Sequence, residues 1–305
     1  MKTKKLAAWF LSLAMALSLA ACGGDSQTSG GETGDSTTAD TSGGDAIVLR
    51  ASHSCAISHP YQLGLEKFAE LVDEKTNGAV QIDIFHSAQL GDERANIEDL
   101  QMGTLDIAVS STGPLGNFVS DYLILDLPFL FTSYEHAHAV LDGEIGQNLM
   151  AKLDDIGIVG GAFWENGFRE MTNSKHPINS VADCAGLKIR CMENQVHMDA
   201  FSALGMDPTP MAWSPSMILF SKPVFEGLNP AYQTALLEAA QEAAAYERSA
   251  CEDSEAEQIA EMEAAGLEVT YPDTTEFQAA MAPVYEKYAD QFGQENIDAI
   301  VNFEY

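Results

Sequence analysis

Basic side chains are scarce in this sequence. Its 305 residues include 15 Lys and Arg against 46 Asp and Glu, which gives a formal net charge of −31. Such a charge keeps a protein soluble and repels nucleic acid and anionic lipid headgroups, so we expect no nucleic-acid partner. An anionic ligand would have to be held by a few well-placed cations. Each arginine is therefore a candidate binding residue: Arg50, Arg94, Arg169, Arg190 and Arg248.

Cysteine is also rare, and its spacing excludes the usual metal motifs. There is no Cys-x-x-Cys pair among the five cysteines. His136 and His138 stand two apart in a predicted helix, which points them to different faces, so we expect no metal site. We expect the cysteines after Cys22 to be buried free thiols, although an oxidising compartment would permit disulfides. They are Cys55, Cys184, Cys191 and Cys251.

Motifs that place a nucleophile beside a base are missing. The sequence contains no Gly-x-Ser-x-Gly elbow and no His-Glu-x-x-His helix. We therefore predict that the protein is not an enzyme, and we expect no cofactor. Beyond residue 21, no apolar run is long enough to span a bilayer.

The N-terminal segment is typical of a bacterial lipoprotein. Lys2, Lys4 and Lys5 precede the uncharged, mostly apolar stretch 6–21, which ends at Cys22. We predict a lipoprotein signal peptide over 1–21 and acylation of Cys22, which would anchor the protein to a membrane outside the cytoplasm, at the cell surface or in the periplasm. The alternative is an ordinary signal peptide followed by a chance cysteine. Residues 22–45, rich in Gly, Ser, Thr and Asp, are predicted to form a disordered tether.

From residue 46 onward the sequence predicts alternating strands and helices. We expect strands at 46–52, 80–85, 105–109, 156–164, 168–172, 186–192, 206–209 and 267–271. We expect helices at 59–75, 92–102, 133–141, 143–154, 195–204, 229–266 (one long helix or a bent pair) and 274–302, the last interrupted near Gly293, and a loop at 110–114. This alternation predicts a parallel α/β sheet. Polar residues follow several predicted strands, where ligands bind in open α/β sheets.

Six short runs, in order, resemble one family. They are QLGDER (89–94), QMGTLD (101–106), PFLF (128–131), GFREMTN (167–173), GLKIR (186–190) and PTPMAW (208–213). On these runs the segment 46–213 closely resembles the solute-binding proteins of TRAP transporters, the DctP-type family, and 214–305 is similar to the family's C-terminal portion.

The resemblance implies a two-lobed, periplasmic-binding-protein-like α/β clamshell with a cleft between its lobes. One lobe would comprise 46–167 plus 216–255, and the other 168–215 plus 256–305. Family members capture an organic acid and pass it to membrane subunits driven by an ion gradient. The resemblance therefore implies that this chain captures a small organic acid anion, a C4-dicarboxylate or a sugar acid, for TRAP membrane subunits. Sialic acid is disfavoured, because the loop 110–113 lacks the acid and the arginine that sialic-acid binders carry there.

The resemblance also assigns ligand-binding residues. Arg190 would hold the ligand carboxylate and Arg169 would support the same group, as the planar guanidinium fork permits. The alternative for each arginine is that it forms an ion pair with a carboxylate on the protein surface. The other implied residues have structural alternatives too, such as a first-turn acid for Glu93 or a core side chain for Trp213. The remaining residues implied by position are His53, Ser111 and Thr112.

The family pattern breaks after Trp213. Family members continue there with a helix, a ligand-contacting Asn, another helix and a strand, whereas this chain proceeds directly to Ser214 and Pro215. A few dozen residues are absent by this comparison, and no crossover helix fits between a strand ending near residue 209 and one starting near 217. An incomplete second lobe is the structural expectation. Two alternative functions remain: an anion-sensing lipoprotein, or a truncated copy with impaired binding.

Overall fold

The computed structural model describes residues 46–167, 171–191, 195–210 and 215–305. The chain divides into two units, Met1–Gly44 and Asp45–Tyr305, and all described residues belong to the second. The predicted signal peptide, Cys22 and the tether lie outside the described residues. Among the helices that are described, none is long and apolar enough to cross a membrane.

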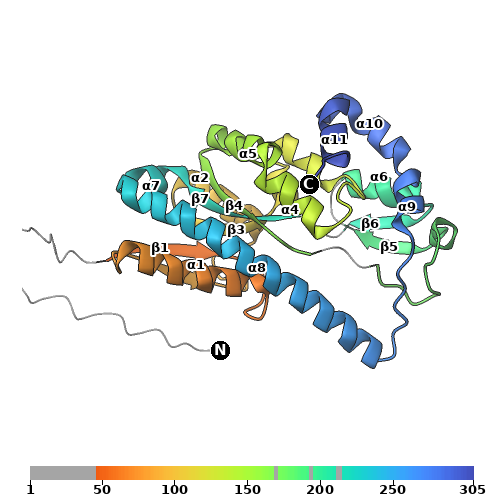
Figure 1. Ribbon diagram of the computed structural model, residues 1–305, viewed down its shortest axis with the longest axis horizontal. Coiled ribbons are helices and arrows are strands. Elements are labelled where there is room, and N and C mark those ends of the chain that lie inside the picture. The colour runs from red at the N-terminus through yellow and green to blue at the C-terminus, as the bar shows by residue number, and fades with distance from the viewer. Residues whose placement is uncertain (1–45, 168–170, 192–194, 211–214) are drawn as a thin grey trace, which may run out of the picture. The chain divides into compact units, whose positions relative to one another are not determined.

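A five-stranded mixed sheet lies at the centre of the fold (Figure 1). Its strands, in spatial order, are β2 (Val80–Phe85), β1 (Ile47–Ser52), β3 (Ile107–Ser111), β7 (Ser216–Ser221) and β4 (Ile158–Trp164). β1 runs parallel to β2 and β3, but β7 is antiparallel to both β3 and β4. The prediction of a parallel sheet is therefore wrong at β7. The chain re-enters the sheet at the edge where β3 ends, pairing Ser216 with Ser111, so β7 must run back in the opposite direction.

Helices cover both faces of this sheet. α1 (Pro60–Thr76) and α8 (Pro230–Ala264) lie side by side on one face, and α2 (Glu93–Met102), α4 (Tyr134–Asp142) and α5 (Glu144–Ala151) lie on the other. The side chains of β7 contribute to both layers, because successive residues of a strand point to opposite faces of the sheet. Ile218 and Phe220 join the core under α1 and α8, whereas Met217 and Leu219 join the opposite core. The short α7 (Lys222–Gly227) connects β7 to α8.

In the described chain, a smaller sheet and four more α-helices lie beyond the five-stranded sheet. β5 (Lys188–Cys191) pairs in parallel with β6 (Asp207–Pro210), and α6 (Gln195–Ala203) connects them. α8 is a single helix of 35 residues, about 52 Å long, that continues past the five-stranded sheet toward this region (Figure 1). The C-terminal helices are α9 (Thr274–Ala280), α10 (Ala282–Phe292) and α11 (Gln294–Val301).

Three local predictions need correction. The predicted strand at 267–271 is absent, and Leu267 and Tyr271 are exposed, since no described strand lies beside them. The predicted strand at 168–172 falls partly outside the described residues, and 171–173 contain no strand. The C-terminal helix breaks at Gly293 as predicted, but also at Met281, just before Pro283, whose missing N–H ends a continuous helix.

The stretch 110–114, predicted as a loop, is regular. β3 continues to Ser111, and the short helix α3 (Thr112–Leu115) follows it directly. Buried, unbroken pairing of β3 with β7 extends the strand to this point. The argument from a missing crossover helix also fails, because β6 and β7 belong to different sheets and need no crossover between them.

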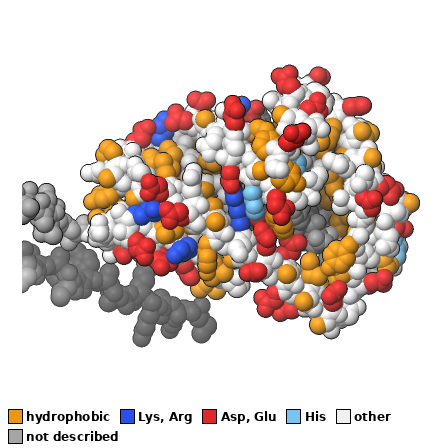
Figure 2. All heavy atoms as spheres, in the orientation of Figure 1, with side chains coloured by type: hydrophobic (Ala, Val, Ile, Leu, Met, Phe, Trp, Pro, Cys, Tyr) orange, Lys and Arg blue, Asp and Glu red, His pale blue; other side chains and the backbone are white. Residues whose placement is uncertain are grey.

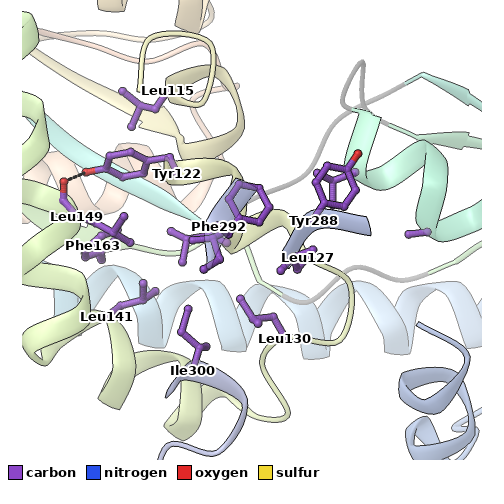
Figure 3. Packing of buried hydrophobic residues seen from close by; sticks show 14 of the residues in the cluster. Leu115, Tyr122, Leu127, Leu130, Leu141, Leu149, Phe163, Tyr288, Phe292 and Ile300 are labelled. Atoms are coloured by element: carbon purple, nitrogen blue, oxygen red, sulfur yellow. Dashed lines mark hydrogen bonds between the residues drawn. The ribbon is translucent and has the colours of Figure 1, made fainter. Parts of the chain in front are cut away.

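One continuous core connects the two sheet regions. Figure 3 shows Tyr288 and Phe292 of α10 and Ile300 of α11 near Leu127 and Leu130, which precede α4. In the same core the Tyr122 hydroxyl donates to the Leu149 carbonyl at 3.0 Å. The described cysteines are free, as predicted, and two of them are buried, Cys184 and Cys251, while Cys55 is half-buried; the Cys191 side chain lies outside the described residues.

Candidate functional site

Polar side chains gather at one edge of the five-stranded sheet. His53 follows β1, Ser111 ends β3 and Thr112 begins α3. The strands β1 and β3 are parallel neighbours, so their carboxyl ends meet at the same edge. His53 and Thr112 are fully buried, and Ser111 is 9% exposed. β7 starts at this edge too, where the Thr112 amide donates to the Pro215 carbonyl at 2.6 Å. We call this region the polar edge: His53, Tyr61, Glu93, Ser111, Thr112 and Asn166.

A chain of hydrogen bonds connects most of the polar edge. The Tyr61 hydroxyl donates to Asn166 Oδ1 at 2.6 Å, and Asn166 Nδ2 donates to Ser111 Oγ at 3.1 Å. Ser111 Oγ donates in turn to Glu93 Oε1 at 2.9 Å. Four different segments of the chain therefore fix one another in position. Such a network holds a carboxylate and two hydroxyls at the surface of the sheet edge in a fixed geometry.

Glu93 is the first-turn acid that the sequence allowed, and its ligand-binding role stays a prediction. It is the first residue of α2, whose N-cap Asp92 accepts from the Ala95 amide at 2.9 Å, so its carboxylate suits the positive end of the helix dipole. Its side chain also turns toward Ser111. Burial raises the pKa of the Glu93 carboxyl, and the hydrogen bond from Ser111 partly offsets this. Glu93 thus offers a half-buried acceptor beside the sheet edge.

His53 is held neutral. Burial lowers the pKa of its imidazole, the hydrogen bond with Gln62 opposes this, and His86 lowers it further. Its Nε2 lies 3.0 Å from Gln62 Oε1, so Nε2 carries the proton and Nδ1 is an acceptor. His53 Nδ1 and Thr112 Oγ1 are two of several buried side-chain atoms, Ser216 Oγ among them, that have no hydrogen-bond partner among the described residues. Buried polar atoms normally have partners, so these two atoms suit a ligand that brings its own hydroxyl groups.

The structure describes no contact between the polar edge and the other predicted residues, which are Arg190, Arg169 and Trp213. Arg190 lies on β5, its side chain is exposed, and it forms no hydrogen bond or ion pair with another described residue. Arg169 and Trp213 lie outside the described residues. The roles of Arg190, Arg169 and Trp213 therefore stay predictions.

Sequence reasoning missed Tyr61 and Asn166. Asn166 comes two residues after β4, which runs in the same direction as β3 because both are antiparallel to β7. A polar residue at the carboxyl end of a strand was therefore the available signal. Tyr61 gave none, since it is the second residue of α1 and fully buried.

A separate cavity of about 480 Å³ lies between α6 and the segments 125–132 and 270–281. Its walls are mostly apolar, with Phe129, Phe201, Leu204, Phe277 and Met281 among them. The volume falls in the range of small-molecule sites, and the walls also carry polar groups, from residues such as Thr132, His197 and Gln278. No described Lys or Arg lines this cavity, so no described cation is placed there to hold an organic anion.

Comparison with known proteins decides the family. The model of the DctP family, described as bacterial extracellular solute-binding protein, family 7, matches residues 51–216 and 212–291. The chain belongs to this family of TRAP-transporter solute-binding proteins. Its members are transport proteins and not enzymes, so the prediction of a non-enzyme is confirmed, as is the two-lobed α/β fold.

Individual relatives cover most of the chain. A TRAP periplasmic solute-binding protein from Polaromonas sp. JS666, bound to D-erythronate, is 37% identical with a TM-score of 0.78 and covers 84% of this chain and 98% of that one. The 2,3-diketo-L-gulonate-binding periplasmic protein YiaO of Escherichia coli is 31% identical over 73% of this chain and 81% of its own length. The C4-dicarboxylate-binding periplasmic protein DctP of Rhodobacter capsulatus is 30% identical over 83% of this chain and 90% of its own length.

Proposed function

We propose that this protein captures a sugar acid, with the ligand hydroxyls on the polar edge and the ligand carboxylate on Arg190, and delivers it to TRAP membrane subunits. The observation that carries the proposal is the hydrogen-bonded chain Tyr61–Asn166–Ser111–Glu93 at the carboxyl ends of the strands. It supports a ligand that is rich in hydroxyl groups. Arg169 and Trp213 are proposed to complete the site from the second lobe, defined by the predicted boundaries 168–215 and 256–305.

Glu93 is the reason to favour a sugar acid over a C4-dicarboxylate. A carboxylate accepts hydrogen bonds from hydroxyls, but it repels a second carboxylate at close range. A sugar acid needs only one cation for its single carboxylate and offers several donors for Glu93 Oε, His53 Nδ1 and Thr112 Oγ1. The relatives named for D-erythronate and 2,3-diketo-L-gulonate are consistent with this choice, while the C4-dicarboxylate relative represents the alternative.

Arg190 would become buried only when ligand binds. Its side chain is exposed and unpaired among the described residues. A guanidinium that forms two parallel bonds to a carboxylate, away from water, would hold the anion strongly in an otherwise acidic protein. Closure of the lobes over the ligand, as in periplasmic binding proteins, would bring it there.

The proposed location is outside the cytoplasm, with Cys22 acylated and residues 22–45 acting as a tether. The family's extracellular description supports the location, and the residues Leu19–Cys22 support the lipid anchor. An anion-sensing lipoprotein would use the same site and differ only in its protein partner.

A shortened second lobe is part of the proposal. The family model matches in two pieces that meet at residues 212–216. The alignment with the Rhodobacter capsulatus protein runs over 302 residues yet includes 83% of this chain, about 253 of its 305 residues, as expected if the relative has residues that this chain lacks. The small two-stranded sheet and the apolar cavity of about 480 Å³ agree with the same reading. A truncated copy with impaired binding is the competing outcome.

Thermal melting with a panel of acids tests the function. D-Erythronate, D-glucuronate, 2,3-diketo-L-gulonate and succinate would each be added at one fixed concentration, about a hundredfold above the Kd expected for the sugar acid that binds. Mass action then predicts stabilisation by about 2.7 kcal/mol, which raises Tm by about 5 to 10 °C for a sugar acid and by less for succinate. A cooperative melt that no acid shifts would identify the truncated, non-binding copy.

A further inference from the structure

A second group of chemically active side chains lies beside α8. It comprises His138 of α4, Glu165 directly after β4, and Glu252 of α8. His138 Nε2 is 3.1 Å from Glu165 Oε2, and one donor atom from each of the three residues lies within 4.8 Å of the others. Glu165 is buried, with 9% exposed, whereas Glu252 is exposed and His138 is half-buried. Three separate segments of the chain thus bring one imidazole and two carboxylates together.

Negative charge is in excess around these residues. The fully buried Glu247 accepts from the Glu165 amide through Oε2 at 2.9 Å, and its Oε1 has no partner among the described residues. Glu255, bonded by the Tyr134 hydroxyl, and Glu135 lie close by. Among the described residues, the neighbouring guanidinium is that of Arg248, which donates to Asp142 through two bonds of 2.7 and 2.8 Å.

The local pKa values reflect this crowding. Burial raises the pKa of the Glu252 carboxyl, and the charge of Glu165 raises it further. Burial likewise raises the pKa of Glu247 to about 8; the bond from the Glu165 amide lowers it, while the charge of Glu165 adds to the rise.

A small cavity adjoins the group. It measures about 30 Å³, and its walls include His138, Glu165, Gly167 and Arg248. A space of this size holds one or two water molecules. Water molecules there can fill the coordination positions that three protein ligands leave open.

We propose that His138, Glu165 and Glu252 bind one divalent transition-metal cation of the Zn²⁺ type. An imidazole nitrogen beside carboxylate oxygens suits zinc better than calcium or magnesium, which prefer oxygen ligands alone. Donor atoms about 2.1 Å from a tetrahedral zinc lie about 3.4 Å from one another. The 3.1 Å between His138 Nε2 and Glu165 Oε2 is close to this spacing, and the exposed Glu252 side chain, whose donor atom lies within 4.8 Å of both, needs to move by at most about 1.4 Å.

The bound cation would join α4, the segment after β4 and α8. These segments are far apart in the sequence: Glu165 stands 27 positions after His138, and Glu252 stands 87 positions after Glu165, so no spacing motif reveals the site. The expectation of no metal site rested on His136 and His138 as a pair, and His136 indeed turns elsewhere, bonding the Ile300 carbonyl at 2.8 Å.

Calorimetric titration of the chelator-treated protein with ZnCl₂ tests the site. We expect one equivalent of Zn²⁺ to bind the parent, and Glu252→Gln to weaken binding by at least about tenfold. Glu257→Gln, an exposed substitution on the same helix, is the matched control and should bind like the parent. MgCl₂ should give no comparable heat.

His138→Gln gives an independent second variant, and circular dichroism checks that each variant is folded. The His138→Gln variant should also lose at least about tenfold in Zn²⁺ affinity. Equal affinity of the parent and Glu252→Gln for Zn²⁺, or binding of several equivalents that neither substitution alters, would overturn the proposal.

Discussion

At the residue scale, Glu247 carries the clearest consequence for stability. Its side chain is fully buried between α1 and the end of β4, and it accepts from the Glu165 amide. Burial raises its pKa to about 8 in the folded protein, against about 4.3 in an unfolded chain. The folded state therefore binds more protons than the unfolded state between these two values, and the free energy of unfolding falls as pH rises through that window.

Glu247→Gln should remove this pH dependence. The amide oxygen still accepts from the Glu165 N–H, and it carries no charge. We expect the parent and the variant to melt most alike at about pH 4 and below, with the variant gaining relative to the parent as pH rises to about 8. Melts at a series of pH values, without added metal, measure the difference. A variant whose Tm falls with pH as steeply as the parent's would show that Glu247 titrates normally.

Some residues of the polar edge could be predicted from the sequence, and others could not. His53, Glu93, Ser111 and Thr112 are predictable because each stands at a strand end or a helix start. Asn166 stands in an equivalent place, two residues after β4, but the hydrogen bonds that make it part of the site come from Tyr61 and Ser111, which are 105 and 55 residues away. Local patterns carry no information on such partners.

At the scale of elements, the close packing of α1 on α8 is a specific feature of this fold. Gly64 of α1 permits it: a Cβ at this position would lie 2.7 Å from Glu247 Cγ and 2.8 Å from Trp164 Cζ3. Both neighbours are buried, with Trp164 only 1% exposed, so neither can move aside easily. The sequence shows a glycine inside a predicted helix and does not show this reason for it.

Gly64→Ala should therefore destabilise the protein, although alanine is the better helix former. Overpacking at a buried contact costs about 1 to 3 kcal/mol, which outweighs the gain of about 1 kcal/mol in helix propensity. Urea unfolding measures the change. Gly227→Ala in α7 is the control, because no atom lies within 4 Å of its added Cβ. If Gly64→Ala unfolded at the same urea concentration as the parent, the contact between α1 and α8 would be looser than described.

Most elements were predictable, and the two failures among the strands at 216–221 and 267–271 share one cause. Helices such as Pro60–Thr76 have strong local signals, with a proline at the start and Asn77 in the left-handed conformation at the end, φ +51°. The direction of β7 and the absence of a strand at 267–271 depend on which strands lie alongside. Strand pairing is set by tertiary contacts, so the alternation of apolar residues alone cannot predict it.

At the scale of the whole molecule, the net negative charge of the protein opposes the approach of an anionic ligand. Acidic side chains are spread over the face shown in Figure 2, while Lys and Arg are few. A net charge of −31 repels an anionic ligand at long range, but salt screens that repulsion more than it screens a buried guanidinium–carboxylate pair. Under the proposed function the binding energy comes from contacts inside the closed site, where Arg190 is the residue proposed to hold the ligand carboxylate.

The most direct test is calorimetric titration of the parent, Arg190→Ala and Lys175→Ala with the sugar acid that raises Tm most. Lys175 is exposed, so its variant removes one positive charge without touching the proposed site. We expect one-to-one binding by the parent, a loss of about 2 to 5 kcal/mol for Arg190→Ala, at least about thirtyfold in Kd, and a change within about twofold for Lys175→Ala. Binding by Arg190→Ala as tight as that of the parent would contradict the proposed mode of capture.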